Sequence, residues 1–204
     1  MSKYKKTGDS DLSIKVVNRR LACENTKFFV YLDHVIDKTG SEVSDYLVVA
    51  PKSTGKNLVA GIAILPIIDG QVGLVRIYRP ALRAYVWEIP HGFVNEGEDE
   101  ETSALRELLE ETGLVVSPNG ISSLGFITPD SGVIAARGHL YVVEAGYLTS
   151  QREHELGLGE FRFFPLREFE EMIERSEIQD SFTLAAWCKY QLLQKTRRSG
   201  GDAS

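Results

Sequence analysis

The chain has few cysteines and no long apolar run, and both absences narrow what it can be. Its 204 residues include only two cysteines, Cys23 and Cys188, far apart in sequence. Two such thiols give neither a disulfide framework nor the paired spacing of a zinc site. No apolar run is long enough to span a bilayer, and no apolar segment follows the basic N-terminal residues. We therefore expect a cytoplasmic protein with reduced thiols, no signal peptide and no membrane partner.

The chain also lacks an excess of positive charge. It has 23 Lys and Arg against 29 Asp and Glu, a formal net charge of −6. Nucleic-acid binding needs a basic footprint, so this balance argues against a nucleic-acid partner. The hydrophobic fraction of 43% is ordinary, and a chain of this length can bury a core without disulfides. An acidic protein can still bind an anionic small molecule when metal ions neutralise both.

The first quarter of the chain is rich in β-forming residues. Three such segments, 13–21, 27–36 and 43–49, are separated by turn-forming residues. This pattern predicts an antiparallel meander, and residues 1–52 are expected to form a small N-terminal β subdomain.

The rest of the chain interleaves strands with a few helices. Two apolar runs around Asp69-Gly70 predict a central hairpin that is covered on both faces. Further strands are expected at 87–90, 122–128, 138–144 and 161–164, and helices at 100–112, 166–175 and 180–195. The prediction is an α/β sandwich over 53–196, followed by a disordered tail, 197–204.

The predicted helix 100–112 has a cluster of acidic residues. Glu107, Glu110 and Glu111 are spaced i, i+3 and i+4, which places three carboxylates on one face. Like charges at this spacing repel, so the helix gains no stability from them. A hard divalent cation reverses the sign of that interaction, and Mg²⁺ prefers oxygen ligands. The cluster therefore predicts a metal site.

Neighbouring residues extend this predicted site. Arg106 can pair with Glu110 or orient another carboxylate, and Glu98, just before the helix, can ligate a further ion. Gly92 gives the incoming loop backbone freedom, and the carbonyl of His91 can complete the coordination.

The complete pattern is Gly92, five residues (93–97), Glu98, seven residues (99–105), and then Arg-Glu-Leu-Leu-Glu-Glu-Thr-Gly-Leu over 106–114. It is identified as the Nudix box, present at every defined position between a predicted strand and helix. The resemblance to Nudix hydrolases implies an α/β/α sandwich with a mixed sheet and a diphosphate-cleaving enzyme that uses Mg²⁺ or Mn²⁺. It also implies metal ligation by the box glutamates, which are Glu98, Glu107, Glu110 and Glu111.

The mechanism that this resemblance implies is attack of water on phosphorus. Metal ions lower the pKa of the attacking water, and a carboxylate takes its proton. The catalytic base is either a box glutamate or an acid on a later loop. That loop contains Glu153, Glu155 and Glu160, of which we select Glu155.

Flanking segments resemble the ADP-ribose and nucleotide-sugar pyrophosphatase branch of the family. They are Pro129 and the segments 76–80, 87–90 and 177–183. By this resemblance Arg79 and Glu88 contact the diphosphate and ribose side of the substrate, whose site also includes Gly92 and Pro129. The branch uses its N-terminal strands to form a homodimer and to cover the base, for which Phe28 is the stacking candidate.

Two features depart from that branch and leave the sugar and the base open. His91 replaces the small residue usual before the box glycine, and 130–137 lacks the proline-glycine pair expected there.

We expect a homodimeric pyrophosphohydrolase that releases a nucleoside monophosphate and a sugar phosphate. One alternative is a Nudix enzyme for a dinucleoside polyphosphate or a coenzyme A derivative. A second is a Nudix-fold sensor without catalysis, which the complete set of box glutamates disfavours.

Overall fold

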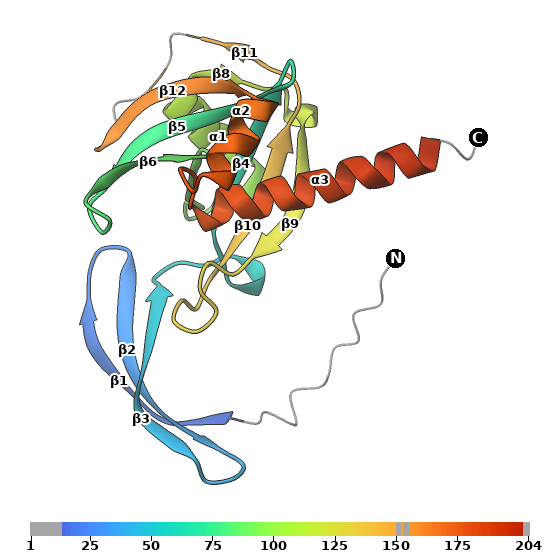
Figure 1. Ribbon diagram of the computed structural model, residues 1–204. Helices are drawn as coiled ribbons and strands as arrows, with labels where there is room; N and C mark the ends of the chain where they lie inside the picture. The colour runs from blue at the N-terminus through green and yellow to red at the C-terminus, as the bar shows by residue number, and fades with distance from the viewer. Residues whose placement is uncertain (1–13, 150–151, 153–155, 202–204) are drawn as a thin grey trace. The chain divides into compact units, whose positions relative to one another are not determined.

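The computed structural model describes residues 14–149, 152 and 156–201, with no side chains for 199–201 (Figure 1). The chain divides into two compact units. One contains the residues up to 52 together with 130–135, and the other contains the remaining residues. Two candidate bases, Glu153 and Glu155, lie outside the described residues. Every helix in the described part of the chain is too short or too polar to cross a membrane.

The first unit is built on a three-stranded antiparallel sheet. Its strands, in the order β1-β2-β3, are Ile14–Glu24, Phe28–Asp37 and Glu42–Pro51. Asn25 Oδ1 accepts hydrogen bonds from the N–H groups of Lys27 and Phe28, which forms the first turn. Asx-type bonds of this kind explain why Asn and Asp separate the strands. The small N-terminal antiparallel sheet predicted from the sequence is confirmed.

Segment 130–135 belongs to this unit, although the sequence placed it with the main domain. Val49 N–H donates to Val133 O at 2.8 Å, and Ala135 N–H donates to Val49 O at 2.9 Å. The Tyr46 hydroxyl also donates to Gly132 O at 2.6 Å. These bonds satisfy backbone groups on the edge of β3, so a segment distant in sequence extends the sheet.

The second unit contains a mixed seven-stranded sheet. The order is β12-β5-β4-β10-β9, with β6 paired to β5 and β7 paired to β4; only the β4–β10 pairing is parallel. The strands are β4 Val59–Ile68, β5 Gln71–Arg79, β6 Ala84–Glu88, β7 His91–Phe93, β9 Ile121–Ile127, β10 Arg137–Val143 and β12 Leu158–Pro165. A separate pair joins β8, Leu114–Val115, to β11, Tyr147–Leu148.

Helices cover both faces of this sheet (Figure 1). Helix α1, Glu100–Thr112, packs against one face, and α2, Leu166–Glu174, and α3, Ser181–Gly201, pack against the other. Along β4, Ile62 and Ile64 contribute to the α1 core, while Ala63 and Leu65 contribute to the opposite core. All four are essentially inaccessible, as a continuous apolar run in a central strand predicts. The α/β/α sandwich predicted from the sequence is confirmed.

Helix α3 differs from the sequence prediction because it continues to Gly201, within the expected disordered tail. Arg197 Nη1 donates to Glu144 Oε2 at 2.7 Å. Glu144 Oε1 also accepts hydrogen bonds from the Tyr190 hydroxyl and from Gln194 Nε2. Three residues on successive turns therefore share one carboxylate at the end of β10, and this contact supports the added helical turns.

Candidate active site

Helix α1 is fixed at both ends by groups visible in its sequence. Asp99 Oδ1 accepts a hydrogen bond from the N–H of Thr102 at 2.8 Å and caps the N-terminus. Gly113, with φ of 74°, adopts the left-handed conformation that ends the helix, and its N–H bonds to Leu109 O. Ala104 and Leu108 are completely buried against the sheet, which fixes the rotation of the helix. This rotation turns the box glutamates toward β7 and the loop after it.

Arg106 connects three of the four box glutamates. Its Nη1 donates to Glu107 Oε1 at 3.0 Å and to Glu110 Oε2 at 2.9 Å. Its Nε donates to Glu98 Oε2 at 3.2 Å, and the same carboxylate oxygen accepts a bond from the Ser103 hydroxyl. These bonds from Ser103 and Arg106 hold the pKa of Glu98 below its ordinary value. The guanidinium thus orients carboxylates that would otherwise repel one another.

The other box glutamate, Glu111, is held by the main chain of β7. It is buried, and its Oε2 accepts the N–H of His91 at 3.2 Å. Arg152 Nε in turn donates to the main-chain oxygen of Glu111 at 2.6 Å, and its Nη2 donates to Gly159 O. The end of α1 is therefore tied to both β7 and β12. No motif in the sequence indicates Arg152, which lies outside the box.

The donor set suits a hard divalent cation, because the box supplies carboxylate oxygens next to main-chain oxygens. Gly92 leaves the space in which the Glu107 carboxylate lies; a Cβ there would come within 3.0 Å of that group. Among the described residues, however, no three His, Cys, Asp or Glu side chains are placed around one point as ligands. The structure gathers the carboxylates around Arg106 and the N–H of His91.

Arg79 and Glu88 form a second polar cluster, on β5 and β6. Arg79 Nε donates to Glu88 Oε2 at 3.0 Å, and Arg79 Nη2 donates to the same oxygen. Arg79 Nη2 also lies 2.8 Å from His91 Nε2. Burial alone would lower the pKa of Arg79, but the hydrogen bond and charge of Glu88 raise it above its ordinary value. The sequence named these residues separately and did not predict that they pair.

Thr183 on α3 holds the backbone next to this second cluster. Its Oγ1 accepts the N–H of Ile89 at 3.0 Å and donates to Asp180 Oδ2 at 2.7 Å. Thr183 is completely buried, so these bonds satisfy its hydroxyl. Segment 177–183 is one of those that resemble the ADP-ribose and nucleotide-sugar branch. In the structure its Thr183 binds the backbone of Ile89, next to Glu88.

The remaining predicted site residues belong to other elements of the fold. Phe28 is on β2 of the first unit, and Pro129 follows β9. Glu160 is exposed on β12, and its carboxylate lies 3.9 Å from Arg76 Nη1. Within the second unit, the described residues bring together the box, Arg79, Glu88 and His91.

Comparison with known proteins finds similar sequences over most of the second unit. A family model described as the NUDIX domain matches residues 57–188. A CMP-5'-(N-acetyl-N-hydroxy-3-aminopropyl)phosphonate hydrolase of Streptomyces rubellomurinus is 28% identical over 125 residues, which is 60% of each chain. An ADP-sugar pyrophosphatase of Mus musculus is 36% identical over 83 residues, or 38% of each chain. The chain therefore matches less than two thirds of the length of either relative.

A solved structure extends the likeness to nearly the whole chain. The crystal structure of an ADP compounds hydrolase superposes with a TM-score of 0.75 and covers 93% of this chain and 98% of its own. Sequence identity is 19%, so this similarity establishes the fold and leaves the substrate undetermined.

Proposed function

The chain belongs to the Nudix family, and on that premise we propose that it is a metal-dependent pyrophosphohydrolase of nucleoside diphosphate sugars. Members of the family generally use divalent metal ions. The observation that carries the proposal is the convergence of all four box glutamates on Arg106 and on the N–H of His91. A ligand sensor has no need of this complete set.

Glu98, Glu107, Glu110 and Glu111 would hold Mg²⁺ or Mn²⁺ in this proposal. The bound ions supply an activated water and neutralise charge on the phosphoryl oxygens. The protein orients the ligands: Arg106 aligns three carboxylates, and β7 aligns Glu111. For the proton of the attacking water we propose Glu155 as acceptor, with a box glutamate as the alternative.

The second cluster supports a diphosphate substrate. Arg79 presents a planar set of donors, which suits phosphate oxygens, and Glu88 binds one edge of that guanidinium. The mouse relative that acts on ADP-sugars supports a nucleoside diphosphate sugar, with ADP-ribose as our first candidate. The products are then a nucleoside monophosphate and a sugar phosphate.

The sheet of the first unit supports a homodimer. It exposes several large apolar side chains, each about half accessible, namely Ile14, Val16, Val17, Leu21, Val43 and Leu47. Apolar side chains gathered on one small sheet mark an interaction surface. We propose that a second copy covers this sheet and that Phe28 helps to bind the base. A monomer in light scattering at micromolar concentration would contradict the dimer.

The proposed function is tested with a substrate panel and a matched pair of variants. Purified protein is incubated with ADP-ribose, UDP-glucose, GDP-mannose, NADH and diadenosine polyphosphates, with Mg²⁺, Mn²⁺ or chelator, and the products are separated by chromatography. We expect metal-dependent cleavage of a nucleotide sugar, and a loss of about 100-fold or more in kcat for Glu111→Gln. Glu101→Gln, an exposed position on the same helix, should retain wild-type activity.

The panel separates the competing readings. Preference for a diadenosine polyphosphate or NADH contradicts the nucleotide-sugar proposal while leaving a pyrophosphohydrolase. Tight binding of a nucleotide without metal-dependent cleavage identifies a sensor and refutes the enzyme.

A further inference from the structure

His91 joins the two clusters of the candidate site. Its main-chain N–H donates to Glu111 on the box helix, and its ring contacts Arg79 at the end of β5. We propose that His91 is a positioning residue that fixes the Arg79 guanidinium for a substrate phosphate. This inference rests on the proposed function, because it requires that Arg79 binds the diphosphate.

Hydrogen-bond chemistry fixes the direction of the contact between the two side chains. A guanidinium donates hydrogen bonds and accepts none. Since Arg79 Nη2 lies 2.8 Å from His91 Nε2, that ring nitrogen is the acceptor and has no proton. The ring proton is then on Nδ1, which lies 3.0 Å from the carbonyl oxygen of Ile89 and donates to it. Both ring nitrogens therefore have partners that agree on one tautomer.

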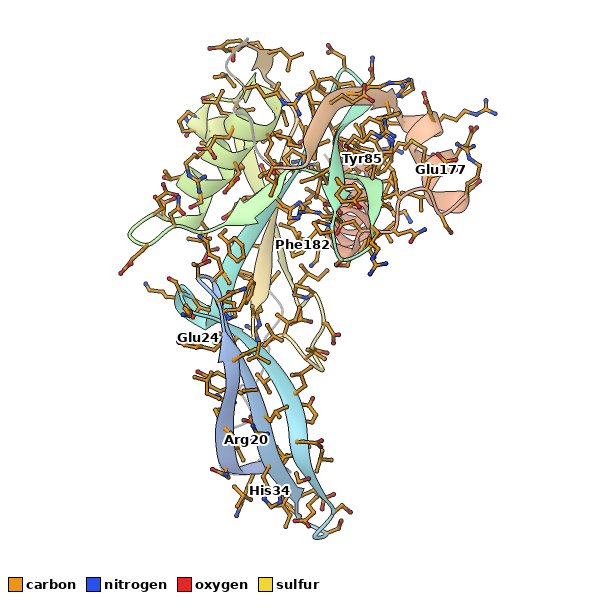
Figure 2. The ribbon with its side chains drawn as sticks, turned by 90° about the vertical axis from the view of Figure 1, so that its left-hand side faces the viewer. Arg20, Glu24, His34, Tyr85, Glu177 and Phe182 are labelled. Carbon is orange, nitrogen blue, oxygen red and sulfur yellow. The ribbon has the colours of Figure 1, made fainter. Side chains whose placement is uncertain are left out.

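The ring of His91 is held in place by an aromatic contact with α3. It stacks on Phe182, with ring centroids 5.6 Å apart and an interplanar angle of 17°. Phe182 extends from the start of α3 into the body of the second unit (Figure 2). Its ring lies over Gly138 of β10, where a Cβ would come within 3.0 Å of it. The imidazole is thus supported on one face and bonded at both nitrogens.

The Arg79 guanidinium keeps part of its donors after its contacts with Glu88 and His91. A guanidinium side chain has five N–H groups: one on Nε and two on each Nη. The Nε hydrogen and one Nη2 hydrogen go to Glu88, and the second Nη2 hydrogen goes to His91. Among the described residues, none accepts a hydrogen bond from Nη1. Two donors on one nitrogen therefore remain for a ligand.

The contact with His91 changes how freely Arg79 can move. Glu88 is buried and holds one edge of the guanidinium, but a single carboxylate leaves the group free to pivot about that edge. His91 adds a bond at Nη2 from a rigid ring and so removes this freedom. The Arg79 side chain is about one third exposed, so part of it is accessible to an anionic substrate. A preoriented donor pair binds phosphate with less loss of entropy.

Three variants at position 91 separate this role from general support of the loop. In His91→Gln the amide oxygen reaches about the position of Nε2 and can accept from Arg79. His91→Asn reaches only the position of Nδ1, and His91→Ala reaches neither. We expect Ala and Asn to raise KM about tenfold with kcat within about twofold of wild type, because Arg79 binds the diphosphate before and during reaction. Gln should restore KM to within about twofold.

A double-mutant cycle checks that the effect passes through Arg79. In an Arg79→Ala background, Ala and Gln at position 91 should give the same KM, because the acceptor has lost its donor. Equal KM values for wild type, Ala, Asn and Gln would overturn the proposal. A fall in kcat shared by all three variants would also overturn it, since that pattern points to Glu111 and the main chain.

The ring tautomer gives a measurement that needs no substrate. Nitrogen-15 NMR of the histidine rings should show His91 protonated on Nδ1 in wild type, with a changed Nε2 signal in Arg79→Ala. Protonation on Nε2 in the wild type would refute the contact. If the wild type cleaves no nucleotide in the panel, the proposed function fails, while the ring signal still decides whether His91 holds Arg79.

Discussion

Gly92 and Glu107 lie so close together that a side chain at position 92 would displace the Glu107 carboxylate. A Cβ built there would come within 3.0 Å of the carboxylate carbon and of both carboxylate oxygens of Glu107. The glycine therefore leaves the space that the Glu107 carboxylate of α1 occupies.

Gly92→Ala should displace the Glu107 carboxylate and lower kcat by about 100-fold, because Glu107 is a proposed metal ligand. The fold should survive, since the end of the Glu107 side chain can shift to make room. The matched control is Gly55→Ala, where a Cβ would meet only ordinary van der Waals contact. Steady-state kinetics and thermal melts measure both effects, and wild-type kcat in Gly92→Ala would contradict the assignment of Glu107.

Arg106→Ala should leave the neighbouring box carboxylates without their shared counter-charge. We expect the metal-free variant to lose about 1.5–3 kcal/mol of unfolding free energy, the range for hydrogen bonds to charged groups. Millimolar Mg²⁺ should restore part of that loss, because a cation replaces the guanidinium charge. Melts with and without Mg²⁺ test this. An equal loss under both conditions would argue against metal binding by these glutamates.

Asp33→Asn tests the partly buried ion pair between Arg19 and Asp33 in the first unit. Arg19 donates to both carboxylate oxygens of Asp33, at 2.8 and 2.7 Å, and lowers the pKa of this acid. Folding therefore favours the ionised carboxylate. The contribution of Asp33 to the unfolding free energy is present above the unfolded pKa of about 3.9 and is lost as pH falls through the folded pKa. The variant should be less stable than wild type at pH 7 by about 1 kcal/mol, because Arg19 is half exposed and solvent screens the pair. This difference in unfolding free energy should shrink below about pH 4.

Urea unfolding at several pH values measures this difference. Asp45→Asn, an exposed acid on β3, is the control and should stay close to wild type throughout. If the stability difference between Asp33→Asn and wild type does not depend on pH, the ion pair is not the cause of that difference.

Arg197→Ala tests the contact that accompanies the long C-terminal helix. Loss of its bond to Glu144 should speed amide hydrogen exchange over 194–198 while leaving kcat unchanged. The global stability change should stay below about 1 kcal/mol, because the pair is exposed. Arg198→Ala, the next residue along the helix, is the control. Equal exchange in both variants would mean that Glu144 does not hold the end of α3.

Local patterns predicted much of the fold and the core of the site. Helix α1 has the same bounds as its sequence prediction, because Asp99 and Gly113 cap it and its apolar face repeats at helical spacing. The Asp69-Gly70 turn likewise located the β4–β5 hairpin. The box glutamates are predicted as metal ligands because the spacing of three of them along one helix places their carboxylates on the same face.

Longer-range relationships needed the tertiary structure. The sequence alone determined the acidic helix, its caps and the family. Only the fold decided that Arg79, Glu88 and His91 meet, since they come from three strands, and that segment 130–135 joins the edge of β3. The physical reason is that helix caps and turns depend on neighbours in sequence, whereas a guanidinium's partners depend on which strands the sheet places side by side.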